Sequence, residues 1–284
     1  MQRILGMGLI AVSAVAYSLA GYFTRLIPLD VMTLLFWRGI FAGLMITALF
    51  VIQHRGAAWR ETRAMGWQGL LIAALSVLSS YLYLAAFRHT TVAAVSVIYA
   101  TLPILTTGLA WLLLRERGTL SELVAGLVVL VGVTIMASGE IGSGRLDGDL
   151  LALGMTLLFG IMMVLIRRGR RISMLPAVAL SCFLTSAVAW HFAKTGPIEA
   201  LPMLHLFLFG TLQLGFGLAF LAMGMRRVSS TTAALIGLVD APLAPFWVWL
   251  AFSEVPPLST VVGGAFVLGA VVWTVATART PVAA

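Results

Sequence analysis

In this chain of 284 residues, 61% of the residues are apolar and only 10% are charged, which is more apolar surface than a soluble domain can bury. The mean hydropathy of +1.06 and the short polar intervals favour a polytopic membrane protein with no soluble domain. The lone cysteine, Cys182, falls within an apolar stretch, which excludes a disulfide and a cysteine metal site in this chain.

About 20 apolar residues are needed to cross a bilayer, and the sequence predicts ten such spans and an all-α fold. The spans are expected at residues 4–23, 31–52, 66–87, 91–114, 121–139, 147–167, 174–194, 202–224, 229–252 and 258–277. The first stretch also has features of a cleavable signal peptide, but its apolar run continues to Phe23.

The placement of the basic residues predicts the orientation in the membrane. If the N-terminus is cytoplasmic, thirteen arginines fall inside, and four basic residues fall outside: Arg25, Arg88, Arg145 and Lys194. Basic loops stay on the cytoplasmic side, so both termini are expected in the cytoplasm of a bacterium, beneath its inner membrane. The net charge of +8 is then a topology signal and needs no nucleic-acid partner.

Two halves of the chain repeat one another. A shift of 138 residues aligns residues 88–138 with the second half, placing Arg88, Trp111, Glu116 and Gly126 on Arg226, Trp249, Glu254 and Gly264. A shift of 142 aligns Tyr17 with Phe159. Each half holds five spans, and an odd number inverts the second copy. We therefore expect two inverted five-helix repeats, 1–142 and 143–284, joined at a glycine-rich turn near Gly142 and Gly144, with a cavity between them.

The residues from Leu34 to Ala42, LLFWRGIFA, resemble the second-span motif of the drug/metabolite transporter superfamily, in its ten-helix EamA branch. The tail of each repeat also resembles this branch, since a glutamate is followed ten residues later by a glycine. The resemblance covers essentially the whole chain and implies ten helices around a central cavity, lined by the first, third and fourth spans and by the sixth, eighth and ninth. It also implies export of small metabolites, with aromatic amino acids among them. The chain departs from the family pattern in one respect. Pro103 has the family's usual fourth-span position, whereas the second half has Asp240 and two prolines that are displaced by one residue or more from the equivalent position.

Asp240 lies deep inside an apolar segment and is followed by Pro242 and Pro245, which should kink the helix. A carboxylate in hydrocarbon costs about 2.5–3.5 kcal/mol, so it is a candidate functional residue. It could bind the ammonium group of a substrate, carry a coupling proton, or be structural and paired with a cation such as Arg38. Sequence alone leaves these three roles open.

Helical spacing predicts polar stripes on several spans. The candidate substrate-binding residues are Tyr17, Ser80, Tyr83, Ser96, Tyr99, Gln213 and Asp240. Hydroxyls, an amide and aromatic rings around a cavity suit a small amphipathic solute. The alternative is that serines, threonines and Gln213 only aid helix packing.

A second set of residues is expected to act in gating or structure: Arg38, Pro103, Glu116, Pro242, Pro245 and Glu254. Arg38 could instead extend its charge toward the membrane surface, or meet a carboxylate in the cavity. The two glutamates should contact the start of the following helix.

These patterns favour a secondary transporter that exports small amphipathic solutes, first of all apolar or aromatic amino acids, by alternating access. A cationic-drug exporter and a lipid flippase are the alternatives. The sequence shows no catalytic, metal-binding, cofactor or phosphate-loop motif, so an enzyme is not expected. The expected partners are a small-molecule substrate and the bilayer. Substrate, coupling ion, direction and oligomeric state are not encoded in recognisable form, and a monomer is compatible with the pattern.

Overall fold

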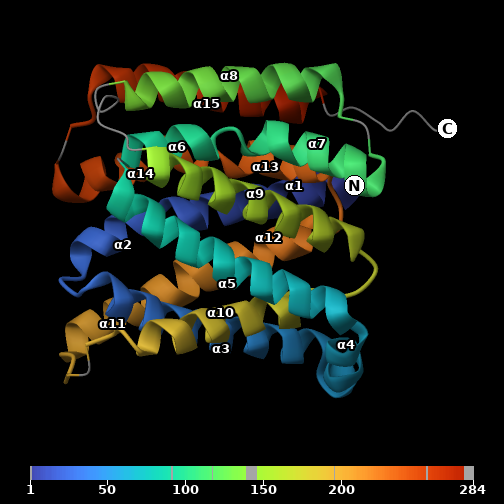
Figure 1. The fold of residues 1–284 in the computed structure, drawn as a ribbon, viewed down its shortest axis with the longest axis vertical. Coiled ribbons are helices and arrows are strands. Elements are labelled where there is room, and N and C mark those ends of the chain that lie inside the picture. Colours follow the sequence, from blue (N-terminus) through green and yellow to red (C-terminus); the bar gives the residue numbers. More distant parts are fainter. Residues whose placement is uncertain are drawn as a thin grey trace.

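The computed structural model describes residues 2–90, 92–116, 118–138, 146–194, 196–253 and 255–277, and every regular element within them is helical (Figure 1). In the first half these elements are α1 (Gln2–Ser18), α2 (Ala20–Leu26), α3 (Val31–His54), η1 (Arg55–Ala57), α4 (Ala58–Ala64), α5 (Gly66–His89), α6 (Val92–Tyr99), α7 (Leu102–Leu114) and α8 (Leu120–Ala137). The second half contains α9 (Leu146–Arg168), α10 (Leu175–Trp190), α11 (Ala200–Leu208), the π-helix η2 (Phe209–Phe216), α12 (Gly217–Met225), α13 (Ser230–Gly237), α14 (Asp240–Phe252) and α15 (Leu258–Thr277).

Within the described residues, eight helical stretches are long and apolar enough to cross a membrane. They are Gln2–Leu26, Val31–Ala64, Ala94–Leu114, Leu120–Ala137, Leu146–Arg168, Ala200–Met225, Ser230–Phe252 and Leu258–Thr277. The prediction of an all-α polytopic membrane protein is therefore confirmed. The predicted join near Gly142 and the predicted residue Glu254 lie outside the described residues.

The helices lie roughly side by side across the view in Figure 1, with α8 and α15 along one edge and α3 and α10 along the other. Both edge pairs are in direct contact, as are α5 with α9, α1 with α12, and α7 with α13. At one end of the bundle are α4, the start of α1, the end of α7 and the loops 169–174 and 226–229 (right in Figure 1). We call it the basic end, and the other, with α2, α11 and the last turn of α14, the opposite end.

Buried apolar side chains from several spans form the interior. Ile10, Ile72, Leu102, Met163 and Met225 belong to one cluster that joins α1, α5, α7, α9 and α12. The outer faces expose many large apolar side chains, as expected where lipid rather than water surrounds the protein. α8 and α15 approach closely because a Cβ added at Gly132 would lie 2.7 Å from the carbonyl oxygen of Gly263.

Side-chain caps begin several helices, and left-handed residues end others. Thr119 and Glu122 form a capping box at the start of α8, and the Ser229 hydroxyl accepts from the Thr232 N–H at the start of α13. Arg115 ends α7 and Ser253 ends α14, with φ of 56° and 57°. These two residues are equivalent by the 138-residue shift, so the repeat seen in the sequence extends to backbone conformation.

Candidate functional site

Asp240 lies where the helix of its span is interrupted. α13 ends at Gly237, and α14 begins at Asp240 after two residues in a turn. The kink predicted at the prolines thus falls just before them, since Pro242 occupies the first turn of α14, where a missing N–H costs no helical hydrogen bond. Pro245 lies inside α14. Asp240 is therefore at the start of a half-helix, where the helix dipole favours an anion.

The fourth span is interrupted in the same way, between Tyr99 at the end of α6 and Pro103 in the first turn of α7. A Cβ added at Gly126 would lie 3.7 Å from the Cβ of Pro103, and one at Gly264 would lie 3.0 Å from the Cβ of Pro242. Pro242 is therefore the structural counterpart of Pro103, despite its displacement by one residue. In each repeat the proline packs against the glycine of the repeat tail, which is Gly126 for Pro103 and Gly264 for Pro242.

Five ionisable side chains from different spans are linked by electrostatic interactions, and we call them the central cluster: Tyr17 of α1, Arg38 of α3, Tyr83 of α5, Tyr99 of α6 and Asp240 of α14. Tyr17 and Tyr83 each interact electrostatically with both Arg38 and Asp240. Tyr99 interacts with Asp240 and with the other two tyrosines. Four of the residues predicted to bind substrate are thus linked to one another, together with Arg38, which was predicted only for gating or structure.

The residues of the central cluster are partly accessible. Tyr17, Arg38, Tyr99 and Asp240 are partly buried, and Tyr83 is 45% exposed. Tyr99 contacts the ring of Phe159 at 6.0 Å between centroids.

Arg38 holds its charge inside the bundle. Its guanidinium carbon lies 4.7 Å from the centre of the Phe209 ring, and its Nε is buried with no hydrogen-bond partner in the described part of the chain. The extension toward the membrane surface considered from the sequence is therefore not what the structure shows. Among the described residues no ion pair joins Arg38 to Asp240, so the structure does not show the fixed pair that was one alternative for Asp240.

Two further predicted residues serve the backbone. Gln213 of η2 is 2% exposed, and its Nε2 donates to the carbonyl oxygen of Tyr17 at 3.3 Å. This carbonyl belongs to the last turn of α1, just before its helix is interrupted at Leu19. The Ser80 hydroxyl donates to the carbonyl oxygen of Ser76 on its own helix at 2.8 Å. Both contacts favour the packing alternative for these two residues.

Ser96, also predicted for the site, is partly buried one turn before Tyr99 on α6.

The part of α1 that carries Tyr17 contacts helices of the second half of the chain. The Ser13 hydroxyl donates to the carbonyl oxygen of Gly217 at 2.7 Å, and a Cβ added at Gly217 would lie 3.2–3.3 Å from the Tyr17 ring. Trp247 of α14 donates from Nε1 to the Ser18 hydroxyl at 2.8 Å.

The sequence reasoning missed Phe159 and Phe209 as neighbours of the central cluster. The repeat contained a signal for Phe159, because the 142-residue shift aligns it with Tyr17. No comparable signal marked Phe209, since one phenylalanine among many in an apolar span does not reveal which face it occupies.

Glu116 contacts the second half of the chain at the basic end. Arg167 at the end of α9 donates from Nε to Glu116 Oε1 at 3.3 Å and from Nη1 to the carbonyl oxygen of Arg226 at 3.2 Å. The predicted contact between Glu116 and the start of the following helix is replaced by this ion pair. Glu122 instead links α8 to α13, since its Oε1 accepts from the Ser229 and Thr232 hydroxyls at 3.2 and 2.7 Å.

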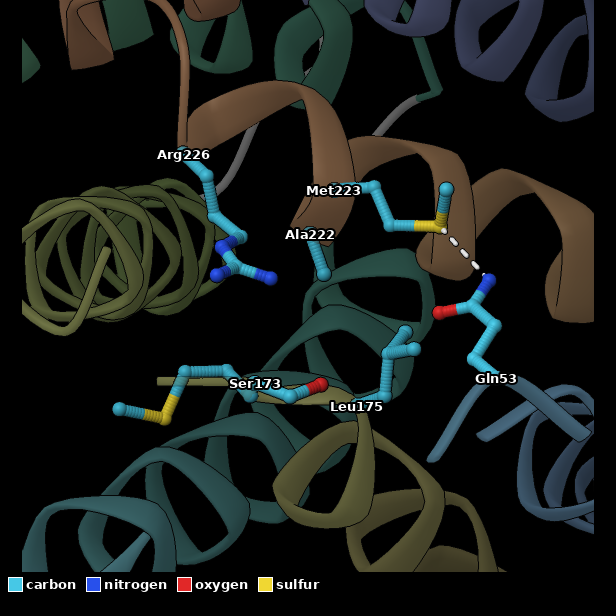
Figure 2. A pocket seen from close by; sticks show the side chains of 7 residues that line it. Gln53, Ser173, Leu175, Ala222, Met223 and Arg226 are labelled. Carbon is cyan, nitrogen blue, oxygen red and sulfur yellow. Dashed lines mark hydrogen bonds between the residues drawn. The ribbon is translucent and has the colours of Figure 1, made fainter. Parts of the chain in front are cut away.

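A small pocket also opens at the basic end, between the end of α3, the start of α10 and α12 (Figure 2). Gln53 donates from Nε2 to the sulfur of Met223 across one side at 3.8 Å, and Arg226 lies on the other side. This pocket shares no residue with the central cluster. No group of three potential metal-ligating side chains occurs within the described residues.

Comparison with known proteins agrees with this arrangement. The EamA-like transporter family matches residues 4–138 and again residues 146–276. A solved crystal structure aligns with a TM-score of 0.83 at 17% sequence identity, covering 97% of this chain and 99% of that chain, which shows a shared fold. Among curated proteins there is no match. Since the two matched stretches together span nearly all of the chain, this protein belongs to the EamA-like transporter family of the drug/metabolite transporter superfamily.

Proposed function

We propose that this protein is a secondary transporter that exports small amphipathic metabolites, first of all amino acids with aromatic or apolar side chains, across the bacterial inner membrane by alternating access. The observation that carries the proposal is the central cluster. Three tyrosines interact electrostatically with a guanidinium or a carboxylate within a bundle of membrane-crossing helices. Ionisable groups at such a depth are costly and mark a solute pathway.

We further propose ten spans in two inverted five-helix repeats, 1–142 and 143–284. The 24-residue helix α5 and the 16-residue helix α10 would add to the eight apolar stretches already described. Inversion is supported by the equivalent helices α8 and α15. The Ser121 hydroxyl at the start of α8 lies 3.0 Å from the Thr277 hydroxyl at the end of α15, so the two helices are antiparallel.

Alternating access needs contacts between the repeats that break as the cavity opens to one side. The ion pair between Glu116 of the first repeat and Arg167 of the second is such a contact. It lies at the basic end, which we place in the cytoplasm with both termini because thirteen arginines fall on that side in the sequence. We assign the interrupted helices at Pro103 and Pro242 to the moving parts.

A cationic-compound exporter is the second candidate, because one carboxylate beside three aromatic rings also suits an organic cation. The Arg38 guanidinium in the same cluster favours the amino-acid proposal, since it would repel such a cation.

Uptake into proteoliposomes tests the proposal, with a panel of amino acids and organic cations, each with and without a pH gradient. Accumulation of phenylalanine, tryptophan or leucine is expected, and accumulation of cations alone would favour the second candidate. Tyr83→Ala should weaken transport about 2- to 10-fold through loss of an aromatic contact. Tyr81→Ala is the matched control, because Tyr81 lies on the same helix and is 61% exposed but has no part in the central cluster. Equal effects of both substitutions would contradict the assignment of the site.

A further inference from the structure

We propose that the pocket at the basic end binds a phosphate oxygen from the headgroup of an anionic phospholipid. The pocket lies between the end of α3, the start of α10 and α12 (Figure 2), and it shares no residue with the central cluster. Binding there does not depend on which solute the protein transports.

The start of α10 supplies hydrogen-bond donors to this pocket. The helix begins at Leu175, directly after Met174, and no described side chain caps its first turn. Ser173, Met174 and Leu175 line the pocket and are each at most 3% exposed. Pro176 has no N–H, which leaves Leu175 and Ala177 as donors in that turn. The first N–H groups of a helix have no partner within it and carry the positive end of the helix dipole, so an anion suits this position.

A buried hydroxyl in the same pocket also lacks a partner. Ser173 is 3% exposed, and its hydroxyl forms no hydrogen bond with any described residue. Figure 2 shows this hydroxyl pointing into the pocket, with the Arg226 guanidinium across from it. A buried polar group without a hydrogen bond is costly, so a ligand that accepts from this hydroxyl would be favoured.

Arg226 gives the pocket its charge. Its Nε donates to the carbonyl oxygen of Arg170 at 3.0 Å, which fixes the orientation of the guanidinium. Arg226 forms no ion pair within the described residues, and none of the described residues that line the pocket is acidic. A phosphate oxygen could accept from the guanidinium and from the Ser173 hydroxyl together, in hydrogen bonds that are strengthened by charge.

The size of the pocket limits what enters it. Its interior holds only about one water-sized group. A whole phosphate is too large, but one of its oxygens fits, with the rest of the group outside. Gln53 is the exposed member of the lining, and its Nε2 donates only to the weakly accepting sulfur of Met223 at 3.8 Å. Gln53 can exchange this sulfur for a second phosphate oxygen, so that the ligand joins α3 of the first half to α10 and α12 of the second.

The surroundings of the pocket favour a lipid as the source of the phosphate. Val51 and Ile52 precede Gln53 on α3 and are 47% and 69% exposed, as expected of a surface covered by acyl chains. Trp59 and Trp67 lie at the same end of the bundle and are 71% and 70% exposed. Exposed tryptophans mark the level of the headgroups, and basic pockets between membrane-crossing helices bind anionic headgroups on the cytoplasmic side.

Lipid binding is measured on the purified full-length protein in detergent, by native mass spectrometry and by thermal unfolding. The probes are phosphatidylglycerol, phosphatidylcholine and inorganic phosphate. Phosphatidylglycerol should bind at least about 10-fold more tightly than phosphatidylcholine, whose quaternary ammonium group would lie close to Arg226. Inorganic phosphate at the same concentration should not raise the unfolding temperature. Equal stabilisation by inorganic phosphate and by phosphatidylglycerol would overturn the lipid as the source.

Two substitutions test the lining residues. Arg226→Gln should weaken phosphatidylglycerol binding about 10- to 100-fold, and Ser173→Ala about 2- to 10-fold. Arg171→Gln is the matched control, because Arg171 is exposed in the loop before α10 and carries the same charge but does not line the pocket. It should weaken binding by no more than about 5-fold, which is the general effect of one cation near a membrane surface.

Ser173→Ala also separates lipid binding from packing. Without lipid, removal of a hydroxyl that has no partner should leave the unfolding temperature unchanged or raise it. With phosphatidylglycerol, the unfolding temperature of this variant should rise by less than that of the wild-type protein. Equal effects of Arg226→Gln and Arg171→Gln, together with wild-type lipid affinity in Ser173→Ala, would overturn the site. If Arg226→Gln does not fold, Ser173→Ala and the comparison of lipids decide alone.

Discussion

The contact between Gly217 and Tyr17 allows the site to be perturbed without touching an ionisable group. A Cβ added at Gly217 would lie 3.2–3.3 Å from three ring carbons of Tyr17. Optimal carbon–carbon contacts are about 3.5–4.0 Å, so in Gly217→Ala the ring must recede by about 0.3–0.5 Å. The backbone of Tyr17 is held by Gln213, so the shift falls on the ring and displaces its hydroxyl from the central cluster.

If that hydroxyl donates to the solute, its displacement forfeits a hydrogen bond of about 0.5–1.5 kcal/mol, which corresponds to a 2- to 12-fold loss of affinity. The free energy of unfolding should change little, because two contributions oppose one another. Overpacking costs about 1–3 kcal/mol, and replacement of glycine by alanine within a helix returns about 0.8–1.0 kcal/mol. We therefore expect Gly217→Ala to lose about 0–2 kcal/mol of stability.

The assay is phenylalanine binding together with thermal unfolding of the same samples. Gly108→Ala is the matched control, since Gly108 lies on α7 and an added Cβ there has no neighbour within 4 Å. It should leave affinity unchanged and raise stability by about 0.5–1 kcal/mol. Wild-type affinity in Gly217→Ala, with the protein folded, would refute the reasoning that Tyr17 contacts the solute.

Three other outcomes are expected. A thiol reagent that cannot cross the membrane should label Gly196→Cys from outside and miss Gly56→Cys, both of which have open space around the added Cβ; the reverse pattern would invert the topology. Glu116→Gln should cost about 1 kcal/mol, because its ion pair with Arg167 is only partly buried. Most of that loss should vanish in the background of Arg167→Gln, as a double-mutant cycle by thermal unfolding would show, and a full additive loss would argue against the pair. Gly132→Ala should destabilise the protein by about 1–3 kcal/mol, since the new methyl group meets a backbone carbonyl of α15 at 2.7 Å; unchanged thermal unfolding would show that α8 and α15 can separate freely.

Several features of the fold could be predicted from residues close together in the sequence. Long apolar runs identify helices that cross a membrane, because unsatisfied backbone groups exclude other structures in lipid. Prolines locate the interruptions of two spans to within a few residues, because a proline removes a local hydrogen bond. Asp240 was identifiable as a functional candidate since a carboxylate in an apolar run is costly wherever the helix is placed.

The roles of Gln213, Ser80 and Glu116 needed the tertiary structure. Gln213 and Ser80 share polar stripes with tyrosines, yet each hydrogen bonds to a backbone carbonyl. Glu116 pairs with Arg167, which is 51 residues away. In each case the hydrogen-bond partner depends on how helices pack together, which the spacing of residues along one helix does not show. The carbonyl of Tyr17, for example, is free to accept from Gln213 because α1 ends one residue later.

By itself, then, the sequence determined that this protein is an all-helical member of a membrane transporter family, with two related halves and a carboxylate among apolar residues. The tertiary structure decided which polar side chains meet. In water, an amphipathic pattern shows which face of a helix is buried, but here lipid and protein interior are both apolar, so the pattern leaves the rotation of each helix open. Only packing between helices could show that Arg38 lies inside, over Phe209 and beside Tyr17 and Tyr83, where it shares the central cluster with Asp240 without being paired to it.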